Sequence, residues 1–385
     1  MKVVSFHPFR QHNFEQAENL RKQRGMKMEL HTTIALPPFF RVFNIKKGRI
    51  ITWNLFINSR QYSIIYLKYL INRDMNYLVN HFQKSVISKL KKNQPDVIIG
   101  FDGCSKMVFE EFSGKVNLVL DFTTLLDEYN FVINPKSYTD KITYLNNNLL
   151  NSRYYKNKLR EIELANLIIV GSRQVRDSIL FKYPEYEKKI KVIHYGYNPE
   201  IFFRNRISSS EKKKQIKFLV VGTLSYHKGS DLIFEAWKKI VTNHSNVELH
   251  ICGACYPEFE VFLKLPNVNY HGFVSQEYLA DLMNQSDILL HPTYIEGYSI
   301  SVLQALVCGM TIIATSNTGI ELENNINGKI IKVGSKSELY AAMCDLIENK
   351  DSMNVYSEQN IKQFSQFTWD KYAEELYLEL QTYFQ

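Results

Sequence analysis

The chain has 385 residues, of which 45% are hydrophobic and 22% are charged, and its formal net charge is +8. This composition supports a large buried core and excludes a disordered, collagen-like or coiled-coil protein. Five scattered cysteines exclude a disulfide-stapled secreted scaffold, and the length predicts two domains.

Short β-rich runs alternate with amphipathic helical patterns in both halves of the chain, which predicts an α/β fold with mainly parallel sheets. The strands predicted in the first half are 2–6, 27–33, 96–101, 115–121, 167–170 and 191–194. Those predicted in the second half are 217–222, 246–252, 268–270, 288–291 and 311–314. Helices are predicted over 76–92 and from near residues 230, 275 and 301. The pattern indicates two doubly wound domains, whose ligands bind beyond the carboxyl ends of the strands.

A basic, serine-rich stretch at 204–216 separates the two halves. Between Arg204 and Lys217 there are six basic residues and one acidic residue, a net charge of +5 in one short segment. A polar run without apolar periodicity favours a solvated hinge over nucleic-acid binding. We therefore predict a first domain over 1–203, a linker over 204–216 and a second domain over 217–363.

The first residues lack the apolar core and cleavage site of a signal peptide, and no apolar stretch reaches the roughly 20 residues of a membrane helix. We therefore expect a cytoplasmic protein. The helix predicted over 76–92 carries lysines beside its apolar stripe, so it presents either a solvated face or a contact for an anionic membrane surface. Peripheral contact with the inner face of the cell membrane is left open.

The loop after the strand 217–222 has the residue types of a phosphate site. Gly222 lets a ligand approach the backbone, and Lys228, beside a predicted helix start, offers a charge and free amides to a phosphate. The spacing of Gly222 and Lys228 does not match a Walker A loop, so an ATPase is not supported. An ordinary strand–helix turn is the alternative for this loop taken alone.

The loop after the strand 288–291 carries an acid in front of a helix. Glu296 is followed by Gly297 and by a helix start near Ser299, whose N-terminal amides can hold an anion. Gln304 follows eight residues after Glu296, in the second turn of that helix. Both side chains can therefore face one ligand that lies across the helix start.

With these motifs in this order, the chain closely resembles the retaining nucleotide-sugar glycosyltransferases of glycosyltransferase family 4. The matching stretches are 163–172, 191–202, 221–231, 267–273 and 286–315, followed by Asn327-Gly328. The resemblance covers roughly half the chain. It implies the GT-B fold, in which two doubly wound Rossmann-like domains face each other across a cleft, and it implies that a terminal helix within 364–385 crosses back to the first domain.

The resemblance also implies the roles of the site residues. Lys228 would bind the donor diphosphate, Glu296 would contact the transferred sugar, and the helix near Ser299 would present its amides to both. The implied donor-binding residues are Gly222, Thr223, Lys228, Phe273, Glu296, Gly297, Tyr298, Ser299 and Gln304. No Asp-x-Asp pair occurs in the sequence, so we expect no metal and a hexosyltransferase-like, metal-independent transfer.

The first domain offers one candidate that does not come from a family motif. Asp121 follows a predicted strand and either orients an acceptor hydroxyl, which would make it catalytic beside Glu296 and Lys228, or caps the strand end. The N-terminal glycine-rich loop of the family is replaced by residues 7–14. The resemblance therefore assigns the acceptor-side residues of this chain poorly.

Two further departures bear on activity. Thr223 stands where many family members have arginine, and Gln304 replaces the second glutamate of the family pattern. We predict an enzyme that moves a sugar from a UDP- or GDP-linked donor to a glycan, with a lipid-linked acceptor favoured, in cell-surface polysaccharide synthesis. It would need no cofactor beyond this co-substrate and bind no nucleic acid. The alternative is a non-catalytic GT-B binding or accessory protein.

Overall fold

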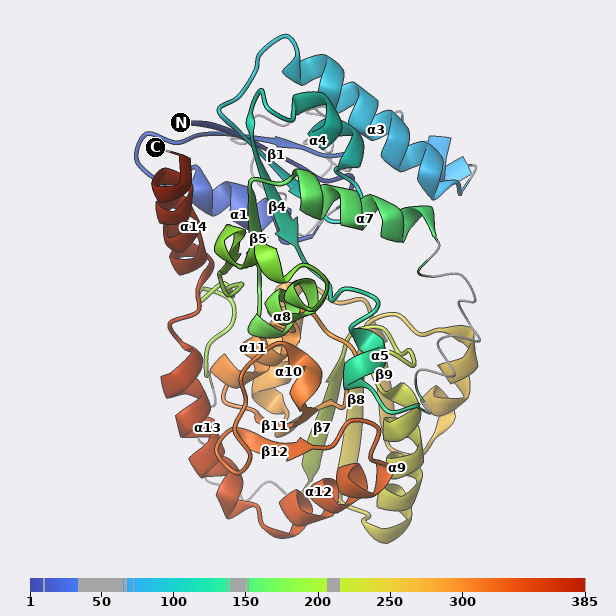
Figure 1. The fold of residues 1–385 in the computed structure, drawn as a ribbon. Helices are drawn as coiled ribbons and strands as arrows, with labels where there is room; N and C mark the ends of the chain where they lie inside the picture. The colour runs from blue at the N-terminus through green and yellow to red at the C-terminus, as the bar shows by residue number, and fades with distance from the viewer. Residues whose placement is uncertain are drawn as a thin grey trace, which may run out of the picture. The chain divides into compact units, whose positions relative to one another are not determined.

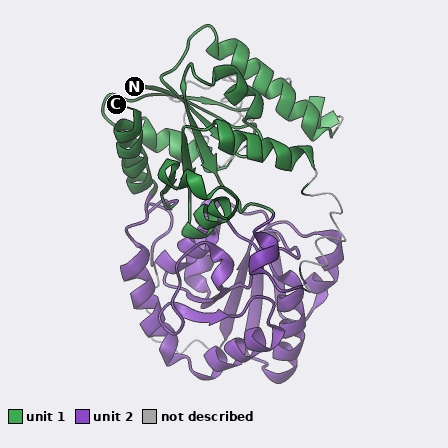
Figure 2. Ribbon diagram, in the orientation of Figure 1, with its two compact units in different colours: residues 1–127, 146–194, 369–385 green, residues 128–145, 195–368 purple. Residues whose placement is uncertain are grey.

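The computed structural model describes residues 1–9, 11–33, 65, 68–71, 73–136, 138, 150, 152–205 and 215–384. The chain forms two compact units (Figure 2). Unit 1 consists of Met1–Asp127, Asn146–His194 and Trp369–Gln385, and unit 2 consists of Glu128–Leu145 and Tyr195–Thr368. Most of the basic linker expected at 204–216 lies outside the described residues.

Unit 1 is built on a parallel six-stranded sheet in the order β2-β1-β3-β4-β5-β6. Figure 1 labels β1, β4 and β5 of this sheet. Its strands are β1 (Lys2–Phe6), β2 (Lys27–His31), β3 (Val97–Phe101), β4 (Asn117–Phe122), β5 (Leu167–Val170) and β6 (Ile190–Val192). Its helices are α1 (Asn13–Leu20), α3 (Met75–Leu90), α4 (Lys106–Phe112), α7 (Arg153–Leu164), α8 (Arg173–Lys182), the 3-10 helix η2 (Pro184–Lys189) and α14 (Trp369–Phe384). Strands β3 and β5 are apolar and buried throughout, as parallel strands are when both faces of the sheet are covered.

Helix α14 belongs to unit 1 although it follows unit 2 in the chain. Its apolar stripe, which includes Leu376 and Leu380, is fully buried. It packs on α1, and the Tyr377 hydroxyl donates a hydrogen bond of 3.0 Å to the carbonyl oxygen of Arg24. Burying this stripe stabilises a helix that would be marginal in isolation.

Unit 2 contains the second parallel sheet, in the order β12-β11-β10-β7-β8-β9. Its strands are β7 (Ile216–Val221), β8 (Val247–Cys252), β9 (Val268–Gly272), β10 (Ile288–His291), β11 (Thr311–Thr315) and β12 (Gly328–Ile331). Its helices are α5 (Asn130–Ile133), α9 (Ser230–Asn243), the 3-10 helices η3 (Pro257–Lys264) and η4 (Ser316–Thr318), α10 (Gln276–Gln285), α11 (Ile300–Val307), α12 (Lys336–Glu348) and α13 (Asp351–Phe364). Trp237 on α9 is fully buried against Phe218 of β7, which fixes this helix on the sheet.

The two sheets agree with the predicted strands except at β12. This strand has only four residues, two of them half-buried, so neither its length nor its pattern distinguishes it from a loop. A second difference concerns residues 128–136 and 138, which the sequence placed in the first domain and the structure places in unit 2. The described residues include no helix with the length and hydropathy that crossing a membrane requires.

Candidate functional site

The candidate site of unit 2 lies where the strand order of its sheet reverses. Strands β7 and β10 are hydrogen-bonded neighbours, and from them the chain proceeds outward to β8 and β9 on one side and to β11 and β12 on the other. The loops after β7 and β10 therefore leave the sheet side by side. In open α/β sheets such a switch point is where ligands bind.

These two loops pack against each other through a glycine. Gly229 has φ +68°, and a Cβ atom there would overlap the carbonyl oxygen of Pro292 in the other loop. The backbone N–H of Tyr294 and the hydroxyl of Thr293 both donate to the carbonyl oxygen of His227, at 2.8 and 3.0 Å. Only glycine fits at position 229, and the close packing that requires it holds Lys228 next to the β10 loop.

Three polar side chains meet between the loops. The Lys228 ammonium contacts the Glu296 carboxylate, and His291, the last residue of β10, has its Nε2 3.5 Å from the same Glu296 oxygen. Burial alone would raise the pKa of Glu296, but the hydrogen bond of His291 and the charge of Lys228 hold it well below its usual range. Burial also lowers the pKa of His291. The site therefore presents an ionised carboxylate beside an ammonium group that is 30% exposed.

Helix α11 begins at this cluster. Ser299 caps the helix, because its Oγ accepts from the backbone N–H of Val302, and the same Oγ lies 3.2 Å from His291 Nε2. The amides of Ile300 and Ser301, in the first turn, have no partner inside the helix and are suited to an anion. Gln304 in the next turn is 9% exposed, and no hydrogen bond to its side chain occurs among the described residues.

The start of α9 differs from the expectation of free amides beside Lys228. The backbone N–H groups of Lys228 and Ser230 both donate to the Ser225 carbonyl oxygen, and that of Gly229 donates to Tyr226. The Ser225 N–H in turn donates to the Ser230 hydroxyl at 2.9 Å. The turn thus uses the amides of residues 228–230 itself, so these three are not available to a phosphate. The Lys228 side chain and the first turn of α11 remain as groups suited to an anion.

The other donor-binding residues named from the sequence have varied environments. Gly222, with φ +125°, and Thr223 lie at the carboxyl end of β7, next to the cluster in the chain. Phe273 is 87% exposed and follows β9, the edge strand two positions from β7, so it lies away from the switch point. Tyr298 is 8% exposed and packs edge-on against Tyr195. The carbonyl oxygen of Gly297 lies so close to Gly319 that a Cβ there would overlap it.

Asp121 in unit 1 lies in a buried hydrogen-bond network. Its side chain has no exposed surface, and one carboxylate oxygen accepts from Gln16 Nε2 at 2.7 Å and from the Tyr372 hydroxyl at 3.2 Å. The same oxygen lies 2.9 Å from His12 Nε2. These partners come from α1, its N-cap and α14, far away in the sequence, so no local signal could reveal them. The carboxylate joins β4 to both helices.

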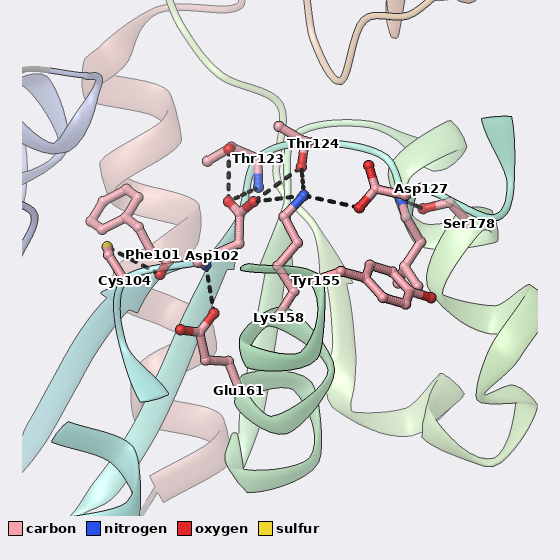
Figure 3. A network of polar contacts seen from close by, with 12 residues as sticks. Phe101, Asp102, Cys104, Thr123, Thr124, Asp127, Tyr155, Lys158, Glu161 and Ser178 are labelled. Atoms are coloured by element: carbon pink, nitrogen blue, oxygen red, sulfur yellow. Dashed lines mark hydrogen bonds and ion pairs between the residues drawn. The ribbon is translucent and has the colours of Figure 1, made fainter. Parts of the chain in front are cut away.

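A second polar network of unit 1 lies at the carboxyl ends of β3 and β4 (Figure 3). Lys158 on α7 donates to the Thr124 hydroxyl at 2.8 Å and forms ion pairs with Asp102 at 3.6 Å and Asp127 at 3.9 Å. One turn further along α7, Glu161 accepts from three backbone N–H groups around the start of α4. Burial raises the pKa of Glu161 to about 8, although those N–H donors oppose the rise. The network fastens α7 to the two strand ends.

Comparison with known proteins gives the fold and a broad enzyme class. Residues 201–363 match the family model described as glycosyl transferases group 1. The uncharacterized glycosyltransferase MJ1607 of Methanocaldococcus jannaschii is 27% identical over 233 residues, which is 54% of this chain and 58% of that protein. The match therefore spans less than two thirds of the relative.

Among solved structures, sucrose-phosphate synthase from Thermosynechococcus elongatus has a TM-score of 0.73 at 14% identity, with 100% of this chain and 99% of that chain covered. The fold of the chain is GT-B. HepE from Anabaena, solved in complex with UDP, has a TM-score of 0.67 at 15% identity and covers 99% of this chain and 100% of its own. The predicted GT-B fold is confirmed, and the group 1 match supports a glycosyltransferase.

Proposed function

We propose that the chain is a retaining glycosyltransferase of the family 4 type that takes its sugar from a nucleoside-diphosphate donor. The observation that carries this proposal is the meeting of Lys228 and Glu296 at the switch point, in front of the open first turn of α11. The group 1 match over residues 201–363 supports it, and so does the UDP complex of HepE, a protein of the same fold.

In this proposal the positive groups of the site bind the departing phosphate. As the bond between the sugar C1 and the phosphate oxygen breaks, its electron pair moves to the nucleoside diphosphate. The Lys228 ammonium and the amides of Ile300 and Ser301 stabilise the charge that develops there. The acceptor hydroxyl attacks C1 from the same face, and its proton passes to a departing phosphate oxygen, which keeps the configuration at C1.

Glu296 has a different role, because its lowered pKa keeps it ionised at neutral pH. An ionised carboxylate accepts hydrogen bonds, so Glu296 would bind hydroxyl groups of the transferred sugar rather than supply a proton. A donor phosphate would draw Lys228 away from its contact with Glu296. Donor binding would thereby free the carboxylate for the sugar at the moment when Lys228 binds the phosphate.

Gln304 would contact the donor ribose. Its amide oxygen can accept from one hydroxyl and its NH2 can donate to the other. The burial of this side chain and its unused hydrogen-bonding groups among the described residues support a ligand contact at this position.

The test of the donor site is a melting experiment with UDP, GDP and ADP in the presence of a chelator. A ligand that binds only the folded state raises stability by about 2.7 kcal/mol at a hundredfold excess over Kd. We expect at least one nucleotide to raise the melting temperature without a divalent ion, and Lys228→Ala to abolish most of that shift. A shift that requires a divalent ion would refute the metal-independent site.

A lipid-linked acceptor is the part of the proposal that concerns unit 1. Near the start of α3, the side chains of Ile71 and Met75 are 79% and 45% exposed, and Lys68 and Lys84 line a neighbouring surface hollow. Exposed apolar groups beside lysines suit an anionic membrane surface. Sedimentation with phosphatidylglycerol vesicles tests this: Ile71→Ser with Met75→Ser should reduce binding, and equal binding would contradict membrane contact there.

Thr223 and Gln304, which depart from the family pattern, favour one alternative function. In it, the chain is a GT-B protein that binds a nucleotide sugar without transferring it. Donor hydrolysis or transfer, measured with a panel of nucleotide sugars and membrane-extracted acceptors, separates the two functions. Nucleotide binding without turnover on any donor would favour the alternative.

A further inference from the structure

His227 lies directly before Lys228 and is held by a distant tyrosine. The residue as a whole is exposed, while its Nδ1 lies 2.7 Å from the hydroxyl oxygen of Tyr138. Tyr138 itself is only 4% exposed, and its ring stacks on Tyr294 with the ring centroids 4.3 Å apart. Tyr138 follows α5 and belongs to unit 2, although it precedes the sheet of that unit by many residues. Tyr138 therefore touches both loops of the candidate site.

The protonation of this pair follows from its surroundings. Burial raises the pKa of Tyr138, so its hydroxyl keeps its proton and donates it to His227 Nδ1. Burial and the nearby charge of Lys228 lower the pKa of His227, so the imidazole is neutral. A neutral imidazole that accepts at Nδ1 carries its proton on Nε2. Within the described part of the chain, no group hydrogen-bonds that second nitrogen.

The main chain of His227 is fixed as well. Its carbonyl oxygen accepts from Tyr294 N and from the Thr293 hydroxyl, both in the β10 loop. The ring is thus oriented at one nitrogen and the backbone is anchored to the other site loop. An N–H group with this support, adjacent to Lys228, is preorganised for an acceptor supplied from outside the chain.

We propose that Tyr138 and His227 form a positioning pair, in which His227 donates its Nε2–H to a phosphate oxygen of the nucleotide donor beside Lys228. This inference rests on the proposed function, because it assigns a further contact to the same donor. His227 contacts the phosphate, and Tyr138 acts through His227 by holding its tautomer and orientation.

Two substitutions of His227 separate ligand binding from a structural role. Glutamine places an amide NH2 near the position of Nε2, whereas asparagine places an amide oxygen near the position of Nδ1. We expect His227→Asn to weaken UDP or GDP binding about threefold to tenfold, the effect of one lost hydrogen bond, and His227→Gln to bind within about twofold of the parent. The corresponding nucleosides, which lack phosphate, serve as controls and should bind all variants equally.

Tyr138→Phe tests the second half of the pair while keeping the stacked ring. We expect UDP or GDP binding to weaken about twofold to threefold in the parent background, with no further loss in the His227→Asn background. Isothermal titration calorimetry supplies each Kd, and the melting temperature without ligand shows whether a variant folds as the parent does.

The possible outcomes distinguish this inference from the proposed function. If the parent binds neither nucleotide, the proposed donor site fails and the positioning pair fails with it. If the parent binds and Lys228→Ala abolishes binding, the donor site stands. In that case, unchanged binding by His227→Asn, or the reverse order with asparagine tolerated and glutamine harmful, would overturn the pair alone.

Discussion

Two lysine–carboxylate clusters, one in each unit, differ in how far they are buried and paired. Lys158 and Asp102 in unit 1 are each 3% exposed, and they pair with each other and with Thr123 and Thr124 (Figure 3). Lys228 and Glu296 in unit 2 are 30% and 19% exposed and lie before helix amides without helical partners. A fully buried pair of charges fastens elements together, whereas a more exposed pair beside free helix amides can bind a ligand.

The largest expected effect is on stability in unit 1. Lys158→Met leaves two carboxylates without their ammonium partner, and breaking a buried ion pair costs about 3–5 kcal/mol. For a unit of this size, that loss lowers the melting temperature by about 6–20 °C, measurable by circular dichroism. Lys156→Met on the exposed side of the same helix is the control. Equal melting temperatures for the two variants would show that the network of Lys158 is not structural.

Lys228→Met should lower turnover and leave stability almost unchanged, the reverse of Lys158→Met. Removing one group that stabilises charge in a transition state commonly costs about 100-fold or more in turnover. We expect sugar transfer to fall by that factor, while the melting temperature stays within about 2 °C of the parent, since the lysine is partly exposed. Lys239→Met, on the exposed face of α9, should keep full transfer. A large drop in stability would make Lys228 a structural residue like Lys158.

Glu296→Gln keeps the shape of the side chain and removes its charge. We expect transfer to fall at least about tenfold, equivalent to about 1.4 kcal/mol of barrier, because the sugar hydroxyls lose an ionised acceptor. Initial rates with the active donor measure the effect, and Glu258→Gln, on the exposed surface of unit 2, is the matched control. Turnover equal to that of the control would remove Glu296 from the site.

The smallest expected effect comes from Gln304→Glu. A carboxylate can accept from both ribose hydroxyls, and hydrogen bonds to a charged group are stronger by about 1 kcal/mol, so nucleotide binding should tighten about fivefold. Gln276→Glu adds the same charge at an exposed position of unit 2 and should leave the Kd unchanged. Weaker binding by the Gln304 variant in calorimetry would indicate an adapted glutamine or a side chain that does not reach the ribose.

The sequence predicted the fold, and it named Lys228 and Glu296 of the unit 2 cluster, because their signals are local. It did not name His291, the third member, as a candidate. Apolar runs bounded by turn residues mark the strands, and Lys228 and Glu296 stand at fixed offsets from strand ends. The sequence could not predict which backbone amides are free in the turn before α9. That depends on hydrogen bonds within the turn, such as the one between Ser225 and Ser230. Tyr138 and His227 are 89 residues apart, so their contact exists only after folding.

Helix α14 belongs to unit 1 but follows unit 2 in the chain, so unit 1 is completed only after unit 2 has been synthesised. Residues 195–368 are made between the sheet of unit 1 and α14, and at about 5–20 residues per second their translation takes on the order of 10–35 s. During that interval the face of α1 that α14 covers is open to water. Nascent chains stalled at Thr368 should therefore bind a chaperone that recognises apolar surface, and release of α14 from the ribosome should end that binding.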